Sequence, residues 1–345
     1  MKQKIIYFDY LRTFAILGVV IIHVSAGVVG DYASYATNDW LISTFYNSLF
    51  RWCVPIFVMI SGALLLNDLK TDTLFTFYKK RALKVIIPLV FWGIVYYIYI
   101  NRFQLETVTF KTFYVSFLKG PVYYPLWFLY MIIFLYFITP FIKRFINKLT
   151  NRQIKWFLIL WFSIISIYNT IFLILNKVNF YTTEISMYIG QFAAGFLFLG
   201  YYILGYYLTK FDIKSSKVFN IIGLISIAIT FFGTYIISAS NNLFGSYFMN
   251  YLNFNTVLVS IMIFLYFKNA TLKSNTILKL ISTYSFGIYL IHVIIMEYIF
   301  RIFKVDFHNM QPLIFIPIFT LLVLILSLLF SLLVSKIPIV KRIMP

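Results

Sequence analysis

Three ionisable residues stand within the first long apolar stretch of the chain, residues 6–27. Asp9, Arg12 and His23 carry groups that hydrocarbon penalises unless they face protein or water. His23 follows Arg12 by eleven positions, so on a helix both project from one face, about 16 Å apart. Histidine suits general-base chemistry near neutral pH, and arginine suits the binding of carbonyls or phosphates. The alternative is structural, with an arginine that snorkels to the interface and a histidine bonded to a neighbouring helix.

The late segment 277–300 carries a second polar stripe. Ser285, Tyr289, His292 and Met296 recur at helical spacing and share one face of an otherwise apolar helix. His292 lies about as deep in this segment as His23 lies in the first one. Two neutral histidines can form a structural pair, which in membranes contributes only ~0.6 kcal/mol on average. A functional role therefore depends on which other residues converge at this depth.

Two further ionisable residues near this end have simpler interpretations. Glu297 is turned by about 140° from His292 and precedes Arg301 by four positions, which favours an interfacial salt bridge between the two. His308 lies in a predicted outer loop beside Asp306, where we expect it to be solvated.

The composition places these helices in a membrane. Hydrophobic residues make up 62% of the chain and charged residues 11%, whereas about a quarter of a soluble chain is charged. The net charge of +19 could suit nucleic acid, but Lys and Arg are confined to short connections between apolar segments, which is a topology signal. We therefore expect membrane lipid, and no nucleic acid, as a partner. The single cysteine, Cys53, allows no internal disulfide and has no histidine close in sequence to activate it.

The predicted fold class is all-α: a polytopic membrane protein of one domain, residues 1–345, with about ten membrane-spanning helices. The spans are expected near residues 6–28, 46–67, 82–100, 124–143, 154–175, 188–209, 217–238, 252–268, 277–300 and 313–335. At the two termini and in alternate connections lie 21 Lys and Arg residues, against seven in the other connections. Both termini should therefore be cytoplasmic. The longest outer connection, 101–123, is expected to contain an interfacial helix at 110–118.

A cluster of basic residues precedes the third span: Lys79, Lys80, Arg81 and Lys84. Such a cluster usually sets topology or attracts anionic lipid, at about 1 kcal/mol per charge. In the functional interpretation, Arg81 and Lys84 share a helical face and hold the phosphates of a cytosolic nucleotide-bearing donor. These residues alone leave both interpretations open.

Several short motifs follow one another along the chain. They are Asp9-Tyr10-Leu11-Arg12 with His23, the stretch VPIFVMISGALL at 54–65, Arg81-Ala82-Leu83-Lys84 with Pro88, PLWFL at 125–129, Gly200 with Gly205, and Tyr284-Ser285 with Tyr289-Leu290-Ile291-His292. Their types and order resemble the acyltransferase-3 family of integral-membrane acyltransferases, whose signature is Arg-x10-His. The resemblance extends from residue 8 to about residue 295. Two positions depart from the family pattern: Lys84 replaces a second arginine, and Pro125 stands where the family often has a histidine.

The resemblance implies transfer of an acyl group, most often acetyl, to a hydroxyl of a cell-surface polysaccharide or lipid-linked glycan. The implied donor is cytosolic acyl-CoA, with acetyl-CoA the expected form, and no metal is expected. The implied location is the plasma membrane, expected to be bacterial. For catalysis we assign His23 as general base with Arg12 and His292; for CoA, Arg81, Lys84 and Lys80; and for substrate contacts, Tyr289, Ser285, Trp127, Asp9 and Arg51.

Two other functions would use the same residues differently. A transporter or flippase for a lipid-linked sugar or polysaccharide would line a permeation path with the Arg12–His23 stripe, although the chain has no matched pair of Gly- or Pro-broken helices. A non-catalytic membrane partner of a polysaccharide synthase would tolerate the loss of His23. Stabilisation by acyl-CoA distinguishes the enzyme from the flippase.

Overall fold

The computed structural model of the chain describes residues 2–35, 37–67, 73–81, 83–176, 195–211, 213–337 and 343–344. Within these residues the regular structure is helical and contains no strand. The α-helices are α1 (Lys2–Val29), α2 (Thr37–Leu49), α3 (Cys53–Leu65), α4 (Leu74–Arg81), α5 (Leu83–Ile100), α6 (Phe110–Lys119), α7 (Trp127–Ile146), α8 (Asn151–Asn176), α11 (Leu199–Lys210), α12 (Lys217–Asn241), α13 (Phe254–Asn269), α14 (Thr276–Ile302) and α15 (Pro312–Ser335). Short 3-10 turns are η1 (Leu105–Thr107), η2 (Tyr124–Leu126), η3 (Tyr247–Met249) and η4 (Phe307–Asn309).

Eight helical segments of the described residues are long and apolar enough to cross a membrane. They are Ile6–Val29, Thr37–Leu65, Leu74–Ile100, Tyr124–Ile146, Lys217–Asn241, Tyr247–Asn269, Thr276–Ile302 and Pro312–Ser335. The predicted all-α, multi-pass membrane fold is therefore confirmed. Of the two remaining predicted spans, 154–175 coincides with the helix α8, and 188–209 is described only from residue 195 onward.

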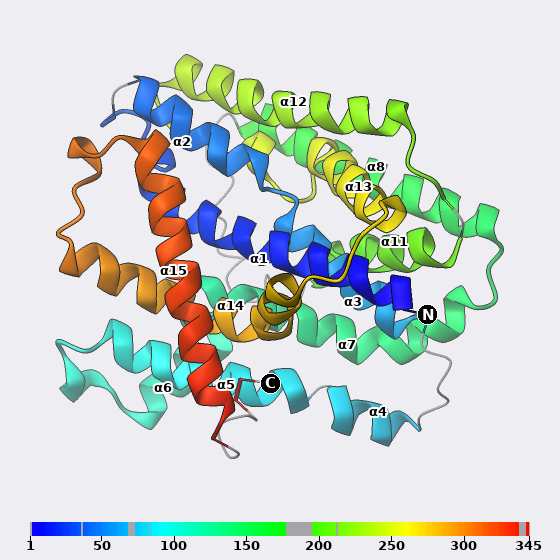
Figure 1. Cartoon of the computed structure of the whole chain (residues 1–345), viewed down its shortest axis with the longest axis horizontal. Helices are drawn as coiled ribbons and strands as arrows, with labels where there is room; N and C mark the ends of the chain where they lie inside the picture. The colour runs from blue at the N-terminus through cyan, green and yellow to red at the C-terminus, as the bar shows by residue number, and fades with distance from the viewer. Residues whose placement is uncertain are drawn as a thin grey trace.

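Helix α1 runs through the middle of the molecule (Figure 1). It packs against α14, α2, α15 and α3, and its side chains Leu11, Ala15, Ile16 and Val20 are fully buried. Peripheral helices such as α12 and α15 instead turn large apolar side chains outward, as helices that face hydrocarbon do. The ionisable residues of α1 are consequently surrounded by protein on several sides.

The second span bends where the sequence predicted one continuous helix at 46–67. It begins at Thr37, and α2 ends at Leu49 before α3 begins at Cys53. Pro55 explains the break, because it has no N–H for the carbonyl of Arg51 and its ring would clash with that carbonyl in a continuous helix. The turn at 50–52 places Arg51 inside the membrane-spanning region.

Helices α3 and α11 approach backbone to backbone. A Cβ atom added at Gly62 would lie 1.8 Å from the carbonyl oxygen of Tyr202, and one added at Gly205 would lie 1.9 Å from the carbonyl oxygen of Met59. Only glycine fits at both positions, since small residues are what allow two membrane helices to come this close. This contact holds α3, which forms one wall of the cavity described below.

The outer connection contains the helix that the sequence predicted at 110–118, observed as α6 (Phe110–Lys119). Thr109 caps it by accepting a hydrogen bond from the backbone N–H of Thr112. Phe110 and Tyr114 are exposed on its surface. In Figure 1, α6 lies at the end of the molecule opposite to the N-terminus and α4.

Candidate active site

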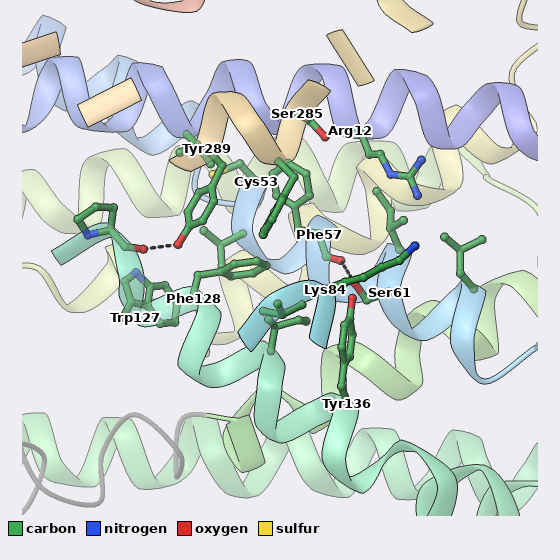
Figure 2. Close-up of a pocket in the computed structure, with 18 of the residues that line it drawn as sticks. Arg12, Cys53, Phe57, Ser61, Lys84, Trp127, Phe128, Tyr136, Ser285 and Tyr289 are labelled. Atoms are coloured by element: carbon green, nitrogen blue, oxygen red, sulfur yellow. Dashed lines mark hydrogen bonds between the residues drawn. The ribbon is translucent and has the colours of Figure 1, made fainter. Parts of the chain in front are cut away.

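A cavity of about 430 Å3 lies among α1, α3, α5, α7 and α14. Arg12 and His23 both line it, so the stripe predicted on the first helix faces one cavity rather than lipid. Most of its remaining wall is apolar, formed by side chains such as Phe57, Ile60 and Ile132. The cavity therefore joins a cationic end to a histidine through an apolar middle section. Figure 2 shows Phe57 in this middle section, between Lys84 and Trp127.

The cationic end combines residues from three helices. Arg12 comes from α1, Arg81 is the last residue of α4, and Lys84 lies in the first turn of α5. The Tyr136 hydroxyl bonds Ser61 and interacts electrostatically with Arg12 and Arg81, and Figure 2 shows Lys84 beside Ser61 and Tyr136. Arg12 and Arg81 are half-buried and Lys84 is exposed. Three positive charges gathered at one end of a cavity favour anionic or strongly polar ligand groups there.

At the other end, His23 is half-buried and contacts two rings. The centroid of its ring lies 5.2 Å from that of His292 and 5.2 Å from that of Tyr124. His292 is fully buried, and its Nδ1 lies 2.7 Å from the carbonyl oxygen of Tyr289. Because a carbonyl only accepts, this nitrogen is the protonated one. His292 Nε2 is buried and has no hydrogen-bond partner among the described residues.

Aromatic side chains build the wall around this end. Trp127 stacks on Tyr251 with ring centroids 6.0 Å apart and an interplanar angle of 20°. The Tyr289 hydroxyl donates a hydrogen bond to the carbonyl of Pro125, which ties α14 to the turn that precedes α7. Figure 2 shows Trp127, Phe128 and Tyr289 at the end of the cavity away from Lys84.

The cavity keeps its cationic side chains apart from the imidazole of His23, a group that can accept a proton. The cations lie at one end, while an imidazole lies along α1 about 16 Å away, at the far end of the same space. An elongated ligand with an anionic head therefore fits with its tail at His23. The described residues contain no group of three or more His, Cys, Asp or Glu side chains that could hold a metal ion.

Comparison with protein families decides the class of protein. The chain matches the model of the acyltransferase domain of the acyltransferase-3 family over residues 5–332. The chain belongs to this family. Its activity is acyl transfer, and its apolar helices make it a multi-pass membrane acyltransferase. Neither a curated protein nor a solved structure gives a significant match.

In the acyltransferase, seven of the eleven predicted site residues line the cavity and four do not. Those that line it are Arg12, His23, Arg81, Lys84, Trp127, Ser285 and Tyr289. Those that do not are Asp9, Arg51, Lys80 and His292. Lys80 is exposed in the last turn of α4, and His292 lies behind His23.

Asp9 and Arg51 support the site from outside the cavity. The Asp9 carboxylate accepts a hydrogen bond of 2.7 Å from the Ser282 hydroxyl, which joins α1 to α14, and its charge favours the Arg12 guanidinium. Arg51 donates to the Asn47 side chain and lies over the ring of Tyr251, 5.7 Å from its centroid. Both residues therefore hold cavity-lining neighbours in place.

The salt bridge predicted between Glu297 and Arg301 is wrong. Glu297 instead accepts hydrogen bonds from the hydroxyls of Tyr99 and Tyr123. Tertiary neighbours with rigid rings outcompete an exposed partner on the same helix, because an i,i+4 ion pair contributes only about 0.2–0.5 kcal/mol. His308 is exposed, as expected, and its ring stacks on Tyr35 at 4.4 Å.

The predicted site residues did not include most of the cavity wall, such as the polar or aromatic side chains of Phe57, Ser61, Tyr136 and Tyr251. Phe57 and Ser61 are four positions apart on α3, inside the family stretch 54–65. This spacing puts them on one helical face, so the sequence could have predicted that both line the site. Tyr136 on α7 and Tyr251 after η3 had no such signal. Each is one of 28 tyrosines in the chain, so residue type alone could not single them out.

Proposed function

We propose that this acyltransferase moves an acyl group, acetyl in the simplest case, from cytosolic acyl-CoA to a hydroxyl of a cell-surface polysaccharide or lipid-linked glycan. The supporting observation is the single cavity that contains both the cationic end, with Arg12, Arg81 and Lys84, and the imidazole of His23. The proposed setting is the plasma membrane of a bacterium. A donor made in the cytosol then reaches an acceptor presented near the opposite membrane surface.

In this proposal the parts of an acyl-CoA occupy the cavity in order, from its cationic end to His23. Arg81 and Lys84 are proposed to bind CoA phosphates, where a guanidinium forms paired hydrogen bonds and an ammonium acts as a point charge. Arg12, deeper on α1, binds the amide carbonyls of the extended pantetheine arm. The apolar middle section beside Phe57 and Ile132 accommodates its methylene groups. The thioester then lies beside His23.

His23 acts as the general base in a direct transfer. The acceptor oxygen attacks the thioester carbonyl carbon while its proton passes to the imidazole of His23. The carbon–sulfur bond breaks, CoA leaves as a thiolate, and the imidazolium returns the proton to the sulfur. General-base assistance of this kind typically contributes 10²- to 10⁴-fold in rate. An acyl-histidine intermediate is the alternative route.

His292 is proposed to position His23. Its Nδ1–H donates to the Tyr289 carbonyl, which leaves the buried Nε2 as a hydrogen-bond acceptor with no partner among the described residues. An N–H of His23 that reaches Nε2 would fix the imidazole and its tautomer. Replacement of His292 by Gln should therefore reduce the turnover rate more than it changes the KM for acyl-CoA.

The decisive experiment uses the purified protein in detergent with acetyl-CoA. Acetyl-CoA at 100 times its Kd should stabilise the fold by about 2.7 kcal/mol, measured as a rise in the thermal midpoint. Release of free CoA thiol reports the chemical step. His23→Ala should keep the stabilisation and lose about 10²- to 10⁴-fold in thiol release. Mass spectrometry of surface glycans from cells with and without the protein then identifies the acyl group and the acceptor.

A matched control is His308→Ala, which removes an exposed histidine of the outer loop and should leave both measurements unchanged. Thiol release by His23→Ala at the rate of the unmodified protein would contradict the catalytic role of His23. A protein that acetyl-CoA does not stabilise would contradict the proposed donor and favour a flippase for a lipid-linked sugar.

A further inference from the structure

A cluster of polar and aromatic groups lies beyond His23, outside the cavity that holds the proposed donor. At its centre is Glu297, on α14 a turn and a half past His292. Its Oε2 accepts a hydrogen bond of 2.7 Å from the Tyr99 hydroxyl, and its Oε1 accepts one from the Tyr123 hydroxyl. Tyr99 comes from the end of α5 and Tyr123 from the turn before η2. Three segments of the chain thus converge on one carboxylate.

The carboxylate is fixed in place but not saturated. Each of its oxygens accepts one tyrosine hydroxyl and keeps a further lone-pair site for another donor. Glu297 is only half-buried, so these sites can be reached. The neighbouring Arg102 guanidinium lies 4.3 Å from the centroid of the Tyr99 ring and donates a hydrogen bond of 2.6 Å to the Tyr99 carbonyl.

Tyr124 connects this cluster to His23. Its ring centroid lies 4.7 Å from that of Tyr123 and 5.2 Å from that of His23. It is 42% exposed, although the two residues that follow it, Pro125 and Leu126, are buried. The ring is thus an accessible surface on a rigid backbone. Tyr124 does not line the donor cavity, whereas its neighbour His23 does.

We propose that Tyr124 and Glu297 form the acceptor subsite and that they recognise a sugar. A pyranose carries C–H groups on one face and hydroxyls around its edge, so it stacks on an aromatic ring while its hydroxyls donate to a carboxylate. Stacked on Tyr124 and bonded to Glu297, the sugar presents a hydroxyl to His23 from the side opposite to the thioester. This inference rests on the function proposed above and specifies how its acceptor is bound.

The test compares acceptors of different kinds with one donor. The probes are acetyl-CoA as donor and the methyl glycosides of glucose, galactose and N-acetylglucosamine as acceptors, with water and 1-butanol as acceptors that have no sugar ring. In the unmodified protein, a glycoside should raise the release of CoA thiol above the rate with water. Glu297→Gln and Tyr124→Ala should each lower kcat/KM for the glycoside by about ten- to a hundredfold. Release with water or 1-butanol should be retained, and Tyr124→Phe should restore most of the glycoside response.

Two matched controls lie in the outer connection 101–123. Glu106→Gln removes an exposed carboxylate and Tyr114→Ala an exposed ring, and neither should change the response to a glycoside. An unchanged half-saturating glycoside concentration in both Glu297→Gln and Tyr124→Ala would overturn the subsite. The subsite would also be overturned if Glu297→Gln lost thiol release with every acceptor and had a lower thermal midpoint. That result would show that Glu297 only stabilises the fold. If no glycoside stimulates the unmodified protein, the sugar acceptor of the proposed function fails, and the subsite with it.

Discussion

Replacement of Gly205 by alanine should separate α11 from α3 and distort the donor cavity. The added Cβ would lie 1.9 Å from the Met59 carbonyl oxygen. A normal contact is about 3.5 Å, so the two helices must move apart by roughly 1.5 Å. Because the obstructing atoms are helix backbone, no change of rotamer relieves the clash. The same argument applies to Gly62, whose added Cβ would meet the Tyr202 carbonyl oxygen at 1.8 Å.

The magnitude follows from two opposing effects. Overpacking in a tight interface costs about 1–3 kcal/mol, and a rigid backbone places this substitution near the upper value. Alanine regains up to about 1 kcal/mol of helix propensity. The net loss is therefore about 2 kcal/mol. Unfolding entropy of about 2 cal/mol/K per residue over 345 residues converts this into a fall of about 3 °C in the thermal midpoint.

Catalysis should suffer more than stability. Helix α3 contributes Phe57 and Ser61 to the cavity wall, and a displacement of about 1 Å at a reacting centre can reduce the rate by about 10²-fold. The assays are the thermal midpoint from intrinsic fluorescence and the release of CoA thiol from acetyl-CoA. Gly93→Ala is the matched control, because its added Cβ would meet side chains and no backbone: Phe117 at 3.3 Å and Phe113 at 3.8 Å.

The double variant separates this explanation from a general intolerance of alanine. Once the helices have moved apart, both Cβ atoms fit, so Gly62→Ala together with Gly205→Ala should cost little more than either substitution alone. Independent effects would instead sum to about 6 °C. An additive loss, or no loss in either single variant, would refute the backbone contact as the reason for these glycines.

Three further predictions concern the polar groups of the site. Arg12→Ala should raise the KM for acetyl-CoA about ten- to a hundredfold, because it removes the charge-assisted hydrogen bond that we propose Arg12 forms with the donor. An unchanged KM measured by thiol release would remove Arg12 from the donor site. Cys53→Ala should retain transfer, since the buried thiol takes no part in the proposed mechanism. The substitution should lower stability by only about 1 kcal/mol. Loss of transfer in a folded variant would contradict this. Ser282→Ala should lower stability by about 1–3 kcal/mol without changing the KM for acetyl-CoA, because the hydroxyl serves only to hold Asp9. A changed KM with an unchanged thermal midpoint would show that Asp9 acts on substrate.

The sequence by itself determined the features that depend on local geometry. Apolar segments of membrane-spanning length predicted the all-α membrane fold. The spacing of Arg12 and His23 placed both on one face, because the helical repeat relates residues on the same helix whatever surrounds them. The helix at 110–118 could be predicted for the same reason.

Only the tertiary structure decided which faces meet. Glu297 bonds Tyr99 and Tyr123 rather than Arg301, and these two tyrosines lie 198 and 174 positions away from it in the chain. Tyr136 and Tyr251 reach the cavity through the packing of α7 and the turn after η3. Such contacts pair residues with no common period, and their free energy comes from burial and hydrogen bonding that exist only once the helices are assembled.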